Sequence, residues 1–131
     1  MTRFVVDAGA VLALAEKEIE VPGRHNLLAP TLLRSQTLST LHEAVHRGRL
    51  APEVARERLI RIGRMPIRLL GDAVLRRRAW EIADSLGWDS TYDAEYVALT
   101  QLQADAFVTT NAKLARAVRK LVTTATLDEL R

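Results

Sequence analysis

The chain has 131 residues, of which 48% are hydrophobic and 27% charged, the balance of a globular protein that can bury an apolar core. It has no cysteine, which excludes a disulfide framework, a thiolate nucleophile and a zinc site built on cysteine. The formal net charge is +3, yet ten arginines and three acidic residues between positions 47 and 78 give that stretch +7 and leave −4 elsewhere. This basic middle suits a polyanionic or acidic partner, and it equally suits the solvated faces of amphipathic helices.

The first half of the chain alternates short apolar runs with helical patterns. It predicts strands at 4–6, 26–29 and 67–70 and helices at 10–16, 31–47 and 52–62. Gly48 and Gly63 are placed to end the second and third helices, and Pro52 to begin the third. Leu38 and Leu41 recur at helical spacing, so we expect both to face the core.

The second half continues the alternation. Its predicted elements are a helix that closes at Gly87, a helix at 91–103, a strand at 106–109, a short helix from Asn111 and a strand at 121–124. Val74 and Tyr92 are expected to point inward, and Trp80 and Trp88 to fill the core or an interface. Strands separated by helices, with no two-residue hairpin signal, predict a parallel sheet covered on both faces, in a single domain over residues 1–131.

The beginning of the chain does not look like a targeting segment. Its apolar stretch is interrupted by Asp7, so it lacks both the continuous apolar core of a signal peptide and the ~20 residues of a membrane span. We therefore expect a cytoplasmic protein.

Polar residues follow the predicted strands where ligands collect in parallel sheets, beyond the carboxyl ends. Asp7 follows the first strand, Asp93 opens a helix, and Thr109 and Asn111 follow the fourth strand. Hard divalent cations prefer oxygen ligands, commonly one or two carboxylates together with substrate phosphates. These residues therefore predict a Mg²⁺ site that could stabilise the charge of phosphoryl transfer and activate water.

Four phrases spread along the chain carry a family resemblance. They are FVVDAGAVLAL at 4–14, APTLLRSQTLSTL at 29–41, YDAEYVAL at 92–99 and FVTTNAKLARAV at 107–118. Together they resemble PIN-domain proteins of the VapC toxin type over nearly the whole chain. The resemblance implies a PIN-like three-layer α/β/α sandwich with a central parallel sheet of four to five strands, and it places catalytic, metal-binding aspartates at Asp7 and Asp93.

The same resemblance implies a function. The chain would be the toxin of a VapBC-type toxin–antitoxin system, a Mg²⁺- or Mn²⁺-dependent endoribonuclease that cleaves a structured RNA. It would form a homodimer and be blocked by a VapB-type antitoxin whose tail lies across the active groove. The run Arg76, Arg77 and Arg78 would suit RNA phosphates, although a solvated helix face explains it as well.

The resemblance is incomplete at the acidic positions. Similar proteins carry a glutamate about six residues beyond the proline of the second phrase, where this chain has Gln36, and their closing aspartate falls on Asn111. Thr109 keeps the threonine that precedes that aspartate, and Asp89, in the loop before a helix, is a reserve acid. The alternative function is therefore a catalytically impaired PIN-fold protein that binds antitoxin or RNA without cleavage.

The candidate site residues also have structural explanations. Asp7 is placed to cap the helix after the first strand, and Asp93 stands three residues after Ser90, as in a capping box. Asn111 is an ordinary helix N-cap, and Gln36 an ordinary polar helix residue. The sequence leaves both explanations open.

Two other folds place an aspartate at a strand end. A phosphoacceptor receiver domain should show an acidic pair early in the chain and a lysine after the last strand, and neither is evident. A phosphatase of the Asp-x-Asp type needs a second acid where this chain has Gly9. Both are excluded.

Overall fold

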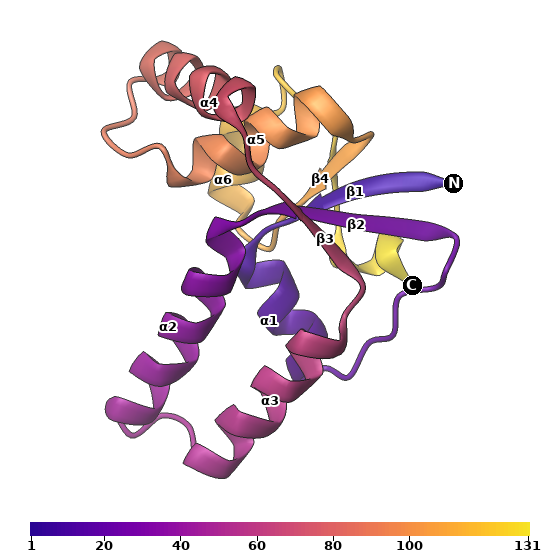
Figure 1. Cartoon of the computed structure of the whole chain (residues 1–131), viewed down its shortest axis with the longest axis vertical. Coiled ribbons are helices and arrows are strands. Elements are labelled where there is room, and N and C mark those ends of the chain that lie inside the picture. The colour runs from indigo at the N-terminus through magenta and orange to yellow at the C-terminus, as the bar shows by residue number, and fades with distance from the viewer.

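The alternating pattern folds into a parallel α/β structure (Figure 1). The computed structural model describes residues 1–131. Its elements are β1 (Thr2–Val6), α1 (Ala8–Glu16), β2 (His25–Pro30), α2 (Leu32–His46), α3 (Pro52–Arg64), β3 (Ile67–Leu70), α4 (Ala73–Leu86), α5 (Tyr92–Gln103), β4 (Ala106–Val108), α6 (Ala112–Val118), β5 (Thr124–Ala125) and a 3₁₀ helix (Leu127–Leu130). None of the helices combines the length and the apolar character needed to cross a membrane.

The five strands lie in the order β3-β2-β1-β4-β5, and every neighbouring pair is parallel. The central strands β1 and β4 carry buried runs at Phe4–Val6 and Ala106–Val108. Strands buried on both faces read as continuous apolar runs rather than as alternating patterns. The predicted α/β sandwich with a central parallel sheet is confirmed, and the sheet has five strands.

The helices form a layer on each face of the sheet (Figure 1). α1 and the paired helices α2 and α3 lie on one side, and α4 and α5 on the other, with α5 against β1, β2 and β4. The chain builds outward from β1 to β2 and β3, then returns to place β4 on the other side of β1. Right-handed crossovers running in opposite directions put their helices on opposite faces. The connection order therefore reverses between β1 and β4.

Two glycines expected to end helices behave differently. Gly87 follows the last residue of α4 with a left-handed φ of 69° and ends the helix as predicted. The prediction for Gly63 was wrong, because α3 continues through it to Arg64. The helix stops where Met65 takes an extended conformation. A residue before proline is disfavoured in the helical region, and Pro66 follows Met65.

Alanine at these two glycines should change stability in opposite directions. Gly63 lies inside a helix with no atom within 4 Å of an added Cβ, so Gly63→Ala should stabilise the fold by about 0.5–1 kcal/mol. Gly87→Ala should destabilise it by about 1–2 kcal/mol because an L-residue is strained at positive φ. Urea denaturation of both variants measures this, and shifts of the same sign would contradict it.

Several side chains expected inside are exposed. Leu38 lies off the buried stripe of α2, and Val74 lies in the first turn of α4 away from its buried residues. Tyr92 is 57% exposed at the start of α5, and Trp80 is 71% exposed, which rules out a core position for it. Trp88 does pack against the core.

Strand boundaries also differ from the prediction near the C-terminus. The fifth strand is Thr124–Ala125 rather than 121–124, and the fourth ends at Val108. β5 pairs only with Phe107 and Val108, so strand structure begins where β4 offers a partner. The preceding Val122 is apolar because it is buried in the turn that follows α6, and it is not part of the strand.

Candidate functional site

The candidate site lies at the carboxyl ends of β1 and β4, where the connection order of the sheet reverses. Val6 and Val108 are paired in the sheet, so Asp7 and Thr109 leave it side by side. The backbone N–H of Asp7 donates to the Val108 carbonyl at 3.3 Å. A crevice beyond strand ends at such a switch point is the usual ligand site of open α/β sheets.

Asp7 caps α1 and belongs to the site at the same time. Its Oδ1 accepts a hydrogen bond from the Ala10 N–H at 2.8 Å, and the Thr109 side chain lies beside the same carboxylate. Burial raises the pKa of Asp7 and outweighs the lowering by Thr109 and the Ala10 N–H, and the nearby charge of Asp93 raises it further. The helix cap expected from sequence is therefore present without excluding a second role.

Asp93 does not cap its helix. The N-cap of α5 is Thr91, which makes no side-chain capping bond, and the Ser90 hydroxyl accepts from the Tyr92 N–H at 3.4 Å. The capping box expected from Ser90 and Asp93 is therefore absent. Asp93 lies at the exposed rim, where partial burial raises the pKa of its carboxyl. This carboxylate is free to bind something else.

Tyr96 links the helices that hold the site, a role that was not predicted from the sequence. Its hydroxyl donates to Gln36 Oε1 at 2.6 Å, joining α5 to α2. Burial raises the pKa of Tyr96 well above its usual range, and the charges of Asp7, Glu95 and Asp93 add to this, so the phenol stays protonated. The signal in the sequence was its place three residues after Asp93, on the same helix face.

Asn111 and Thr109 serve the start of α6. Asn111 Oδ1 accepts from the Leu114 N–H at 3.1 Å, which is the N-cap role expected from sequence. The Asn111 N–H in turn donates to the Thr109 hydroxyl oxygen at 3.1 Å. Thr109, 8% exposed, thereby connects the α6 cap to Asp7.

Asp7 and Asp93 form an acidic pair, and a cavity of about 360 Å³ adjoins it at Asp93. It is lined by Gln36, Trp88, Asp89, Ser90, Tyr92 and Asp93. The reserve acid Asp89 thus shares a cavity with Asp93 and Gln36. Of its two aromatic side chains, Trp88 comes from the segment that connects α4 to α5, and Tyr92 is the first residue of α5.

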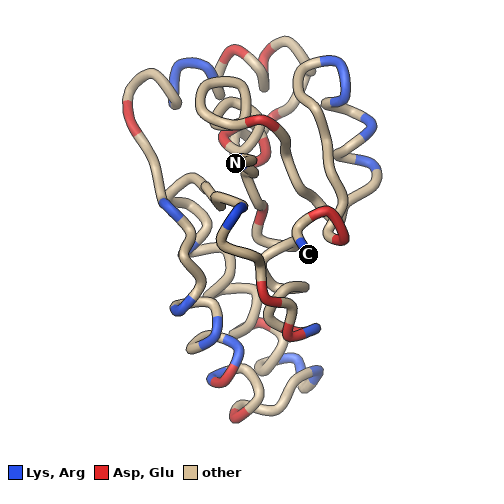
Figure 2. The backbone as a smooth tube through the Cα atoms, turned by 90° about the vertical axis from the view of Figure 1, so that its right-hand side faces the viewer, with Lys and Arg blue, Asp and Glu red and all other residues tan.

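The three arginines of α4 have different surroundings. Arg78 donates to Gln101 Oε1 at 2.7 Å and to Glu81 at 3.0 Å, so it ties α4 to α5. Arg76 and Arg77 are exposed and make no ion pair. Figure 2 shows basic and acidic positions interspersed along the chain, which favours solvated helix faces for many of the other arginines.

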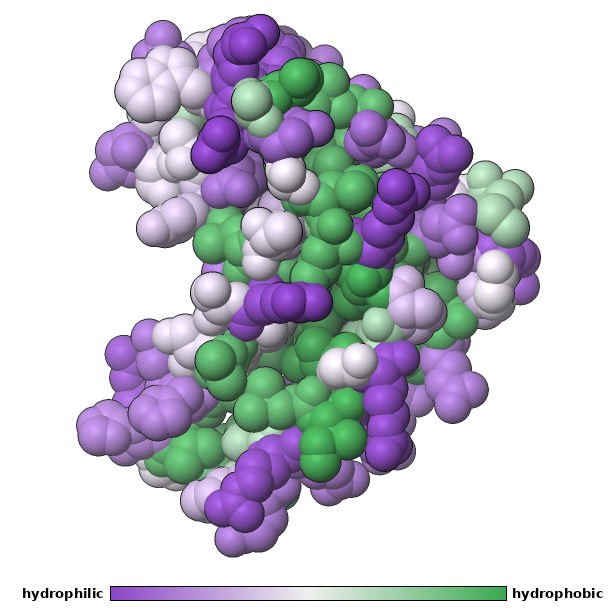
Figure 3. Space-filling model, in the orientation of Figure 1, coloured by the Kyte–Doolittle hydropathy of each residue, from purple (hydrophilic) through white to green (hydrophobic).

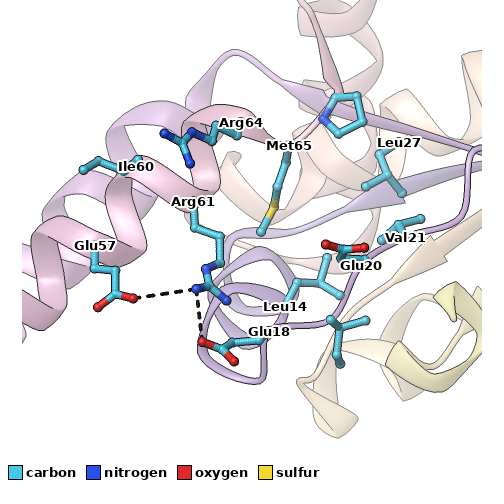
Figure 4. A pocket seen from close by; sticks show the side chains of 12 residues that line it. Leu14, Glu18, Glu20, Val21, Leu27, Glu57, Ile60, Arg61, Arg64 and Met65 are labelled. Carbon is cyan, nitrogen blue, oxygen red and sulfur yellow. Dashed lines mark hydrogen bonds and ion pairs between the residues drawn. The ribbon is translucent and has the colours of Figure 1, made fainter.

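A larger cavity, about 660 Å³, is elsewhere and contains none of the candidate acids. It lies between α1, the segment after it and α3 (Figure 4). Inside it, Arg61 lies 3.1 Å from Glu18 and 3.7 Å from Glu57, and the pair with Glu18 connects the segment after α1 to α3. Both glutamates are already paired with Arg61, so the larger cavity is the weaker candidate for ligand chemistry.

The acidic pair suits a divalent cation held partly by a substrate. The ion pairs of the structure use Glu18, Glu57, Glu81 and Asp128, so neither Asp7 nor Asp93 has a cationic partner. No three His, Asp or Glu side chains are placed to hold a metal ion together. Two uncompensated carboxylates fit Mg²⁺, which keeps waters and binds substrate phosphates, better than they fit a closed metal cage.

Comparison with known proteins finds likeness at the level of structure. No protein-family model matches the chain, and no curated protein does. PAE2754 from Pyrobaculum aerophilum is similar with a TM-score of 0.76 and 22% identity, over 98% of this chain and 92% of that one.

Two VapBC structures are similar as well. VapBC2 from Rickettsia felis, bound to a DNA fragment from its promoter, has a TM-score of 0.69 and 9% identity over 95% of this chain and 98% of that one. VapBC-1 from nontypeable Haemophilus influenzae has a TM-score of 0.61 and 14% identity over 96% and 98%. The chain has the PIN-like fold of the VapC type that its sequence motifs implied.

Proposed function

We propose that the chain is the toxin of a toxin–antitoxin pair, a metal-dependent endoribonuclease that cleaves a structured RNA in the cytoplasm. The observation that carries the proposal is the pair Asp7 and Asp93, two carboxylates without cationic partners at the switch point of a PIN-like sheet. The likeness to two VapBC structures supports the same class of function.

The metal would be Mg²⁺ or Mn²⁺, bound by Asp7 and Asp93. When bound, it supplies charge stabilisation for phosphoryl transfer and lowers the pKa of a coordinated water. Thr109 and the Ala10 N–H hold the Asp7 carboxylate in one orientation. Side chains fixed in this way need less reorganisation when a ligand arrives.

Gln36 has a different task from the glutamate that similar proteins carry. Because its Oε1 accepts the Tyr96 hydroxyl, its Nε2 is the group that remains to donate. An amide N–H₂ repels a cation and attracts a phosphate or base oxygen. Gln36 would therefore contact the RNA rather than the metal.

The partners follow from the same proposal. Figure 3 shows the molecule hollowed between the helices α4 and α5 and the pair α2 and α3. The tail of a VapB-type antitoxin would lie in this hollow and place a cation, such as an arginine, against the unpaired carboxylates. We also propose a homodimer, for which the exposed Trp80 is a candidate contact.

A second function is favoured by the two amides. Gln36 is bonded to Tyr96, and Asn111 to the first turn of α6, so neither adds charge to the metal site. A chain that binds antitoxin or RNA without cleaving would have this arrangement. The two functions differ in metal-dependent cleavage.

The wild-type protein should bind Mg²⁺ weakly alone and at least tenfold more tightly with RNA, because RNA phosphates supply charge that the protein lacks. Calorimetry with and without a structured RNA measures this, and gel analysis measures cleavage with Mg²⁺, Mn²⁺ or EDTA. Cleavage that continues in EDTA would contradict the metal role. Tight antitoxin binding with no cleavage in any metal would establish the second function.

A further inference from the structure

The cavity beside the acidic pair combines two aromatic rings with hydrogen-bonding groups. Its volume of about 360 Å³ is at the low end for small-ligand pockets, so it suits one compact ligand group. Asp93 belongs both to the cavity and to the acidic pair. A ligand in the cavity would therefore lie next to any phosphate held at that pair.

Tyr92 offers a largely exposed ring that forms no aromatic pair in the structure. It is 57% exposed, and neither its ring nor that of Trp88 stacks on another aromatic side chain. An exposed tyrosine lining a cavity presents a flat apolar face to a ligand. Nucleobases stack on such faces, and single-stranded RNA is commonly recognised in this way.

Trp88 is held in place by the end of α4. Its backbone N–H donates to the Ala83 carbonyl at 2.8 Å, and the Gly87 N–H donates to the Asp84 carbonyl at 3.2 Å. This is the hydrogen-bond pattern of a glycine-terminated helix, and it fixes the direction of the chain that follows. One wall of the cavity is thus positioned before any ligand arrives.

The polar groups of the cavity present both donors and acceptors. Gln36 offers its Nε2 hydrogens because Tyr96 occupies Oε1, and the Asp89 carboxylate has no ion pair or hydrogen bond in the structure. The Ser90 hydroxyl accepts from the Tyr92 N–H, which leaves its own hydrogen to donate. Donors beside a carboxylate recognise a ring that carries a carbonyl next to N–H groups.

We propose that this cavity is a nucleobase site that takes a guanine of the RNA, unstacked and placed beside the scissile phosphate. Guanine has a carbonyl oxygen for Gln36, and two adjacent N–H groups for Asp89. The base stacks on Tyr92 against the wall formed by Trp88. The inference deepens the proposed function, on which it rests for the identity of the polymer, and it adds a base preference next to the cleavage point.

Fluorescence of Trp88 tests the site without metal and without catalysis. The chain has two tryptophans, so Trp80→Phe leaves Trp88 as the only reporter in otherwise intact protein. The probes are RNA trinucleotides with a central guanine, adenine, cytosine or uracil, titrated in EDTA. We expect saturable quenching by the guanine trinucleotide, with binding at least tenfold tighter than for the uracil one.

Variants locate the contacts. Tyr92→Ala and Asp89→Asn should each weaken guanine trinucleotide binding about tenfold, and Asp89→Asn should also reduce the preference for guanine over uracil. Tyr92→Phe keeps the ring and should bind normally. Lys113→Ala, on α6 outside the cavity, is the matched surface control and should change nothing.

Three results would overturn the inference. They are equal quenching by all four trinucleotides, no effect of Tyr92→Ala, and quenching by an antitoxin peptide but by none of the trinucleotides. Failure of the nuclease function has a different signature, since guanine-selective quenching in EDTA would then persist without metal-dependent cleavage. Cleavage without any base preference would leave the nuclease function standing and remove only the base site.

Discussion

Replacing Asp7 with asparagine will strongly reduce RNA cleavage and make the folded chain more stable at neutral pH. Asn caps a helix about as well as Asp, so the bond from the Ala10 N–H is kept. The variant loses one of the two carboxylates that would hold the metal, whose charge stabilisation is worth several kcal/mol, so cleavage should fall about 10²- to 10³-fold. Gel assays of cleavage and thermal denaturation in EDTA measure the two effects.

The stability gain has a defined pH dependence. Because the pKa of Asp7 is raised in the folded state, the folded chain holds this proton more tightly than the unfolded chain does. Stability is therefore lost as pH rises from the usual value of 3.8 through the raised pKa of Asp7. The difference in Tm between Asp7→Asn and wild type should be positive at pH 7 and vanish at acidic pH, where Asp7 is protonated in both states.

Asp72→Asn is the matched control. Asp72 caps α4 by accepting from the Leu75 N–H at 2.8 Å, the same distance as at Asp7, and it lies outside the candidate site. Its substitution should leave cleavage and metal response unchanged. If Asp7→Asn cleaves as fast as Asp72→Asn, the metal role of Asp7 is wrong and only its helix cap remains.

Much of the fold could be predicted from the sequence, because strands buried on both faces appear there as continuous apolar runs. Phe4–Val6 and Ala106–Val108 are such runs, and the polar residues directly after them mark the strand ends. Exposure was harder to predict. Because both have apolar rings, Tyr92 was expected inside and Trp80 in the core or an interface, but both are exposed. The side of each helix that is covered is decided by packing between α4, α5 and the sheet, and local sequence patterns do not specify this packing.

The candidate site was predictable only to the level of its segments. That Asp7 and Thr109 meet follows from parallel strands with adjacent carboxyl ends. The absence of a capping bond at Asp93 did not follow, because Ser90 and Asp93 have the spacing of a capping box and the chain turns so that Thr91 takes the N-cap position. The hydrogen bond from Tyr96 to Gln36 joins residues 60 positions apart, so no local sequence pattern predicts it.

Restoring both acids with Gln36→Glu and Asn111→Asp should strengthen metal binding by one to two orders of magnitude. Each change replaces an amide dipole with a charge, and about tenfold per carboxylate corresponds to ~1.4 kcal/mol. Neither change should break the fold, because Asp caps α6 as Asn does and the Tyr96 hydroxyl can donate to a carboxylate. Calorimetry with Mg²⁺ and Mn²⁺, and RNA cleavage rates, measure the effect.

The restored protein should bind metal more tightly but be less stable than the wild type when metal is absent. Without metal, two added charges beside Asp7 and Asp93 repel one another, so Tm in EDTA should fall below that of the wild type and recover when Mg²⁺ is added. Gln101→Glu controls for the addition of one negative charge away from the site, because Gln101 Oε1 accepts from Arg78 at 2.7 Å. If the restored protein binds metal no better than Gln101→Glu, and Asp7→Asn changes nothing, the carboxylates do not form a metal site and the non-cleaving function is the correct one.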